Sequence, residues 1–261
     1  MARFAKTANA RVATAFWTYT AVGSTEAAGR PATNISELGR PSKSWRSTTT
    51  GEQSVVLDFS TARSVPSVFL DNCNFATVKI QGNAADVWTS PSFDSGNLTL
   101  NNDPKLGRRK RLIDLTAFNL RFMRILISSQ TVDDNASFYE IGDVASVQTI
   151  ATLTENIEYP LRWVGRVPKI RNDFISGGFE TVEISSARPL NIQFAVRQSN
   201  DSANVQEIYD LFGNKNRKII LDLSLVQDWE SYLCEVESDI NNSWVNSGLF
   251  DFNEIEAAVF V

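Results

Sequence analysis

Short runs of alternating apolar and polar residues constrain the fold of this chain more than any other feature of its sequence. Within residues 53–59, Val55, Leu57 and Phe59 would share one face of an extended strand, because successive side chains of a strand point to opposite sides of a sheet. Residues 121–128 follow the same pattern, and turn-rich segments separate such runs along the chain. Many short strands spaced by turns predict an all-β chain that folds as a sandwich or jelly roll.

One segment has the period of a helix instead. Between residues 203 and 212, the apolar side chains recur at the spacing that lines one face of a helix. Asn204 and Glu207 can form a capping box at its start, and Gly213 can terminate it. We therefore expect one short helix over residues 203–212, with its apolar face on a sheet.

The chain is long enough for two domains, with 261 residues. Residues 138–144 have the pattern of a closing strand, and residues 152–159 have that of a new one. We expect a first domain over residues 1–148 and a smaller β-sandwich with the helix over residues 149–261. Either part can enclose a core of its own.

The chain contains no histidine. This removes the Ser-His-Asp and Cys-His nucleophile systems and the usual nitrogen ligands for zinc, copper and iron. Its 25 basic and 30 acidic side chains give a net charge of −5, which argues against a general nucleic-acid-binding protein. The composition favours a scaffold or binding module over an enzyme, and we expect no catalytic residue, cofactor or metal ion.

No stretch of the sequence has the apolar core of a secretory signal or the length of a membrane span, so we expect neither. Cys73 and Cys234 are the only cysteines, and we interpret them as buried free thiols rather than a disulfide.

Four motifs of the first half occur in a recognisable order. Trp45 precedes a glycine turn, and an apolar-Asp-apolar strand around Asp58 follows it. Later come an aromatic-apolar-Arg-apolar strand around Arg124 and a closing strand that carries Glu140. This order resembles the discoidin, or galactose-binding jelly-roll, superfamily. The resemblance implies a jelly roll whose relatives often bind glycans through the loops at one end.

The same residues raise two physical questions. Asp58 lies within a strand between two apolar residues and needs a partner, for which Arg124 is a candidate. The aromatic rings could form a platform for a sugar or could pack in the core and loops, and packing is the interpretation that we favour. These rings are Trp45, Trp88, Phe93 and Tyr139.

The second half resembles the tube-like domain of bacteriophage tail proteins, especially distal-tail and baseplate components. The resemblance is carried by residues 175–179, the helix segment and residues 218–223 and 228–236, in that order. It implies a ring of identical subunits, a hexamer or a trimer, in a virion whose parts are made in the host cytoplasm. Acidic residues would line a lumen through which DNA passes as cargo. The candidates are Glu155, Glu158, Asp173, Glu180 and Glu183.

A dense basic run occupies residues 108–111, as Arg108, Arg109, Lys110 and Arg111. It could contact DNA or an acidic neighbouring subunit, or form a solvated loop before the next strand, and we favour the loop.

Oxygen ligands for calcium could come from residues 133–135 and 71–72. These residues lack the spacing of a calcium loop, so we interpret them as turn formers.

Our leading hypothesis is a non-enzymatic structural component of a bacteriophage tail. Its second half would form the ring, and its first half would contact fibres, baseplate proteins or host glycan, with Trp45, Trp88 and residues 108–111 as candidate contacts. The alternative is a free-standing carbohydrate-binding module with an accessory β-domain. A weaker third hypothesis is a tail-associated glycan hydrolase.

Overall fold

The computed structural model describes the backbone of twelve segments of the chain. They are residues 11–15, 18–40, 43–104, 107–152, 162–163, 169–173, 179–183, 188–197, 218–222, 231–236, 241–244 and 249–259. Strands dominate these segments, and one turn of 3-10 helix, η1 (Ala32–Ser36), stands among them. The predicted all-β class is confirmed, whereas the helix predicted over 203–212 lies outside the described residues. None of the helical structure in these segments has the length and apolar character to cross a membrane.

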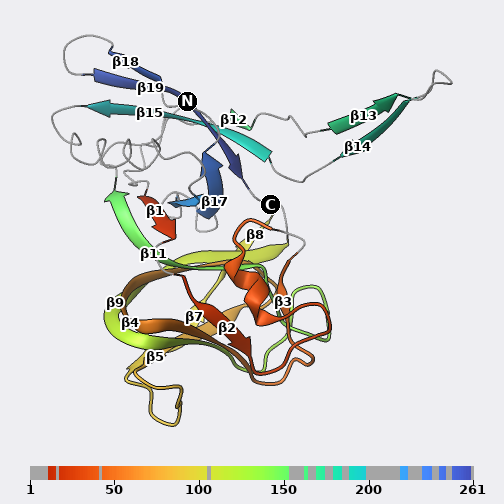
Figure 1. The fold of residues 1–261 in the computed structure, drawn as a ribbon, viewed down its shortest axis with the longest axis vertical. Helices are drawn as coiled ribbons and strands as arrows, with labels where there is room; N and C mark the ends of the chain where they lie inside the picture. The colour runs from red at the N-terminus through yellow and green to blue at the C-terminus, as the bar shows by residue number, and fades with distance from the viewer. Residues whose placement is uncertain are drawn as a thin grey trace, which may run out of the picture.

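Two long strands, β4 (Gln53–Cys73) and β9 (Arg108–Ile127), organise the first half of the chain. They pair antiparallel along almost their whole length. The register shifts next to Ser60, whose φ of 64° lies in the left-handed region that non-glycine residues rarely adopt. Irregularities of this kind bend a strand, and Figure 1 shows both strands curving round one side of the lower part of the molecule.

The bend divides the ladder between two layers. In the first layer, the N-terminal part of β4 pairs with β2, and the C-terminal part of β9 pairs with β5, which in turn pairs with β6 and β7. In the second layer, the other halves of β4 and β9 pair with β11 and β8. A two-stranded sheet of β3 and β10 lies beside them. The bounds are β2 Thr20–Gly23, β3 Trp45–Arg46, β5 Thr77–Asn83, β6 Phe93–Asp94, β7 Leu98–Thr99, β8 Asn101–Asp103, β10 Glu140–Ile141 and β11 Asp143–Thr152.

The main hydrophobic core lies between the two layers. Val55 and Leu57 of β4 and Met123 and Ile125 of β9 are fully buried in it, while the residues between them are only half-buried. This alternation confirms the strand pattern predicted over residues 53–59 and 121–128.

The second half of the chain continues the same sheet. The N-terminal strand β1 pairs with β11 on one side and with β16 on the other, and the sheet extends from β16 through β17, β19 and β15 to β12, with β18 on β19. The predicted domain boundary at residue 148 therefore falls inside β11, and the division into two domains stays a prediction. The bounds are β1 Arg11–Ala15, β12 Arg162–Trp163, β15 Arg188–Arg197, β16 Lys218–Asp222, β17 Ser231–Val236, β18 Asn241–Trp244 and β19 Leu249–Val259.

A second, smaller core joins the two halves. Phe69 and Leu112, which lie on the outer face of the second layer, pack with Ile220 and Leu233. The adjacent residues Val68 and Ile113 face the main core instead. The second layer is thus buried on both faces. For this reason its strands contain successive apolar residues instead of alternating apolar and polar ones.

Lys110 also lies at this junction. Its Nζ is 3.0 Å from Asp103 Oδ2, and both side chains are almost fully buried. The same Nζ lies 4.4 Å from the centre of the Tyr232 ring, in a cation–π contact between the two halves.

We predict that Lys110→Ala lowers the free energy of unfolding by about 3–5 kcal/mol, because it leaves the buried Asp103 carboxylate without its cation. Urea unfolding followed by circular dichroism measures the loss. The double variant with Asp103→Leu and Lys110→Met should regain most of it. A loss below about 1 kcal/mol, the value of an exposed pair, would contradict this account of the junction.

Candidate functional site

The basic run is part of strand β9 rather than the solvated loop that we favoured. Arg109 makes a two-pronged ion pair with Asp133, and Arg108 contacts Asp134 at 2.9 Å and Glu140 at 3.3 Å. The loop interpretation was wrong, because the acidic residues that neutralise Arg108 and Arg109 come from a distant part of the chain. With these partners, the charged side chains can lie on a strand.

The other two members of the run are also engaged inside the molecule. Lys110 occupies the buried pair at the junction, and Arg111 Nη1 donates a 2.7 Å hydrogen bond to the carbonyl oxygen of Thr99. The run therefore stabilises the fold with charges that already have partners.

The acidic turn at residues 133–134 has the same role. Both carboxylates pair with arginines of β9. Within the segments that the structure describes, no group of three or more histidine, cysteine, aspartate or glutamate residues could hold a metal ion.

Two of the candidate aromatic residues lie in the interior. Trp45 is fully buried, and its Nε1 donates a 3.0 Å hydrogen bond to the carbonyl oxygen of Thr25. Tyr139 is equally buried and packs edge-on against Phe75. Phe93 is half-buried and packs against the ring of Phe118, with the ring centres 4.7 Å apart.

Asp58 pairs with Arg121 rather than with Arg124, so the predicted pairing was wrong. Nε and Nη2 of Arg121 donate to the two carboxylate oxygens of Asp58 at 2.8 and 2.7 Å. In the ladder, Asp58 stands opposite Phe122, whereas Arg124 stands between Val56 and a residue of β5. The register therefore places Arg124 two residues further along the ladder than Phe122, where it donates to Gln81 of β5.

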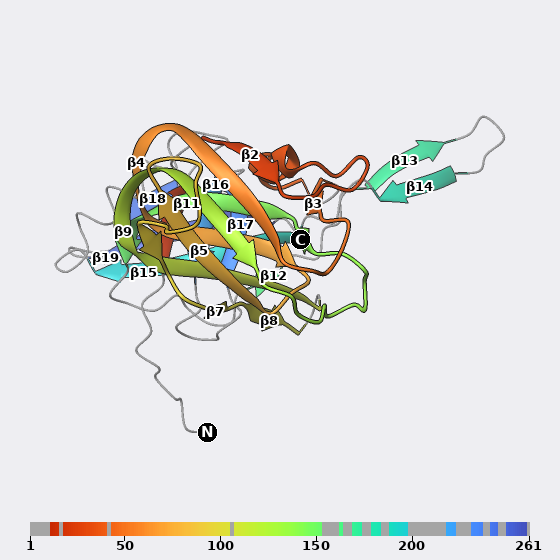
Figure 2. The same ribbon diagram turned by 90° about the horizontal axis from the view of Figure 1, so that it is seen from below.

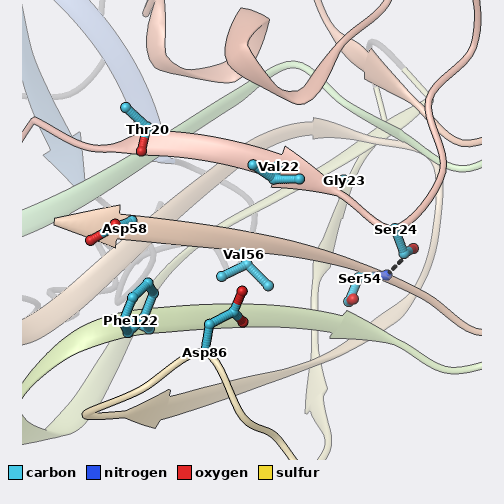
Figure 3. Close-up of a pocket in the computed structure, with 9 residues that line it drawn as sticks. All are labelled: Thr20, Val22, Gly23, Ser24, Ser54, Val56, Asp58, Asp86 and Phe122. Carbon is cyan, nitrogen blue, oxygen red and sulfur yellow. Dashed lines mark hydrogen bonds between the residues drawn. The ribbon is translucent and has the colours of Figure 1, made fainter. Parts of the chain in front are cut away.

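A shallow depression of about 270 Å³ lies on the outer face of the first layer (Figure 3). β2 contributes Thr20 and Val22, β4 contributes Val56 and Asp58, and β9 contributes Phe122. These side chains point outward because they alternate with buried core residues along each strand. The apolar floor is open to solvent, and Val22 is 66% exposed.

Polar groups surround this floor. Ser24 and Ser54 lie at one end of the depression, where the backbone N–H of Ser54 donates to Ser24 Oγ at 2.9 Å (Figure 3). Asp86 enters from the loop between β5 and β6, and its carboxylate extends toward Val56 (Figure 3). The depression thus combines an apolar floor with hydroxyl and carboxylate groups at its rim.

Trp88 lies on the same loop as Asp86 and is half-buried. Its ring is stacked on the guanidinium group of Arg124 at 4.7 Å, and its Nε1 donates a 2.6 Å hydrogen bond to Asp86 Oδ1. Through this hydrogen bond, Trp88 is joined to Asp86, which lines the depression. Sequence reasoning missed Asp86, since residues 82–86 had only the composition of a turn, and the sheet that they approach is assembled from distant strands.

No protein-family model and no curated protein sequence matches this chain. Among solved structures, the chain is similar to the family 32 carbohydrate-binding module of C. perfringens NanJ in complex with galactose, with a TM-score of 0.40, 16% identity and coverage of 50% of this chain and 93% of that one. It is similar to chitosan-binding module 1 of the chitosanase/glucanase from Paenibacillus sp. IK-5, with a TM-score of 0.38, 18% identity and coverage of 52% and 98%. It is also similar to the lectin domain of lectinolysin in complex with Lewis B antigen, with a TM-score of 0.39, 12% identity and coverage of 51% and 93%.

The Asp58–Arg121 pair should make the stability of the fold depend on pH. Hydrogen bonds from Arg121 hold the pKa of Asp58 below its usual value. The pair therefore stabilises the fold when the pH is above the unfolded pKa of about 4, and this contribution is lost as the pH falls through the lower folded pKa. Thermal melts of wild type and Asp58→Asn should differ at pH 7 and converge toward pH 2.5. A difference that grows as the pH falls would contradict the assignment.

Proposed function

We propose that the first half of the chain is a non-enzymatic glycan-binding module, and that the depression on the outer face of β2, β4 and β9 takes one sugar ring. The observation that supports this most directly is the combination of an apolar floor with a rim of hydroxyl and carboxylate groups. A pyranose has the complementary surface, with a C–H face that fits an apolar floor and hydroxyl groups at its edge that donate to carboxylates.

The local charges favour a neutral ligand. The Asp58 carboxylate is neutralised by Arg121. Asp86 acts electrostatically on Arg124, whose guanidinium group is stacked on the neighbouring Trp88 ring. Because each acid has a cation nearby, a charged ligand would gain little, whereas a polyhydroxyl ligand can use the carboxylates as hydrogen-bond acceptors.

The test is a glycan array, followed by calorimetry on the glycans that bind. We predict that Asp86→Asn weakens binding of those glycans at least about tenfold, because a charge-assisted hydrogen bond becomes a neutral one. Asp133→Asn is the matched control, since it makes the same chemical change at a turn beside the other end of β9, and it should leave the affinity unchanged. Wild-type protein that binds no glycan would overturn the proposal.

We further propose that the second half assembles with identical subunits into the ring of a bacteriophage tail, which would make the chain a virion protein with tail or baseplate proteins as neighbours. The supporting observation is the hairpin of β13 (Lys169–Asp173) and β14 (Phe179–Glu183), which forms a two-stranded sheet of its own. It extends away from the remaining strands in both ribbon views (Figures 1 and 2). A two-stranded hairpin is marginally stable in water, so contact with a second copy would stabilise it. Three of the acids proposed to face a lumen, Asp173, Glu180 and Glu183, lie in this hairpin, whereas Glu155 and Glu158 lie outside the described residues.

Light scattering after size exclusion, together with negative-stain electron microscopy, tests the ring. We predict a trimer or a hexamer of the 29.0 kDa chain and a monomer when residues 169–183 are replaced by a short Gly-Ser linker. Hydrogen exchange in β4 and β9 should be the same in both proteins, which controls for folding. A wild-type protein that stays monomeric at high concentration would contradict the ring.

A further inference from the structure

We infer that Trp88 is a positioning residue, which holds Asp86 over the apolar floor of the depression through a relay anchored on the sheet. This inference rests on the proposed glycan-binding function, and it adds the residue that orients the acidic acceptor of the site. Trp88 does not line the depression, so its role is to act through Asp86 rather than on the ligand.

The relay starts on β5. Gln81 is almost fully buried, and its Nε2 donates a 2.6 Å hydrogen bond to Asp94 Oδ2. This bond directs Gln81 Oε1 toward β9, where it accepts hydrogen bonds from Nε and Nη2 of Arg124, the former at 2.9 Å. Two donors to one acceptor fix the plane of the guanidinium group.

The oriented guanidinium group then holds the loop. The Arg124 guanidinium carbon lies 4.7 Å from the centre of the Trp88 ring, a distance at which the cation and the ring attract each other. With the ring held, its Nε1 points at Asp86 Oδ1 at 2.6 Å. Asp86 is thereby held where it lines the depression.

The rest of the loop depends on the Trp88–Arg124 contact for its attachment to β9. Residues 84–87 are exposed, and the other ties of the loop include hydrogen bonds to the Asn83 side chain from Ser92 Oγ and from Asn83 to the carbonyl oxygen of Val87. Asn83 is itself at the end of β5. These bonds attach the loop to the end of β5, whereas the Trp88–Arg124 contact attaches it to the central strand β9.

Two substitutions separate the two steps of the relay. Trp88→Phe keeps an aromatic ring over Arg124 but removes the N–H donor, and Arg124→Ala removes the cation below the ring. Hydrogen exchange measured by mass spectrometry on the peptide that covers residues 83–92 reports on the loop without any ligand. We expect faster exchange in Arg124→Ala and little change in Trp88→Phe. Equal, wild-type exchange in Arg124→Ala would overturn the anchoring step.

Affinity tests the second step. The probes are the methyl glycosides of galactose, glucose, N-acetylglucosamine and fucose, each titrated by calorimetry into wild type, Trp88→Phe, Asp86→Ala and the double variant. We expect Trp88→Phe to weaken binding about tenfold in the wild-type background and to have no further effect in the Asp86→Ala background, which lacks the acceptor through which Trp88 acts.

These experiments distinguish a failure of the proposed function from a failure of the positioning role of Trp88. If none of the four glycosides binds wild type and the glycan array is also blank, the proposed function fails, whereas the exchange data still decide the anchoring step. If wild type binds and Trp88→Phe weakens binding equally in both backgrounds, the ligand contacts Trp88 directly and the positioning role is wrong. If Trp88→Phe has wild-type affinity, the hydrogen bond to Asp86 has no role in binding.

Discussion

The bent antiparallel ladder of β4 and β9 is the constraint on which the rest of this structure depends. Because the two strands stay paired on both sides of the bend at Ser60, they supply strands to both layers and enclose the main core between them. Four further strands, β2, β5, β8 and β11, pair directly with this ladder. The outer face of the first layer, on which the depression lies, is a direct consequence of the same arrangement.

The second layer shows how the two halves are connected. Its outward apolar residues, such as Phe69 and Leu112, are covered by β16 and β17, and Lys110 places a buried charge between Asp103 and the Tyr232 ring. Few arrangements of the two halves can satisfy a buried ammonium group, because a shift of either half would separate it from one of its partners. The junction therefore combines a non-directional apolar contact with a directional ionic one.

The depression is formed by both the sheet and a loop, which is why it combines apolar and acidic groups. The sheet contributes a floor whose residues are set by strand register, and a loop contributes the Asp86 acceptor. The strands supply the rigid part of the site, and the Arg124–Trp88 contact joins the loop to it. A loop attached in this way can vary in sequence while the sheet stays the same.

The sequence by itself determined the all-β class and the faces of the strands around Val55 and Ile125, because a period of two specifies which side chains are buried whatever strand lies alongside. It also identified Asp58 as a charged residue within a strand that needs a partner, but it paired Asp58 with the wrong arginine. Only the tertiary structure decided that Asp58 meets Arg121, that the basic run meets Asp133 and Asp134, and that Asp86 reaches the floor beside Val56. Such pairs depend on register and loop path across dozens of intervening residues, and local periodicity contains no information about either.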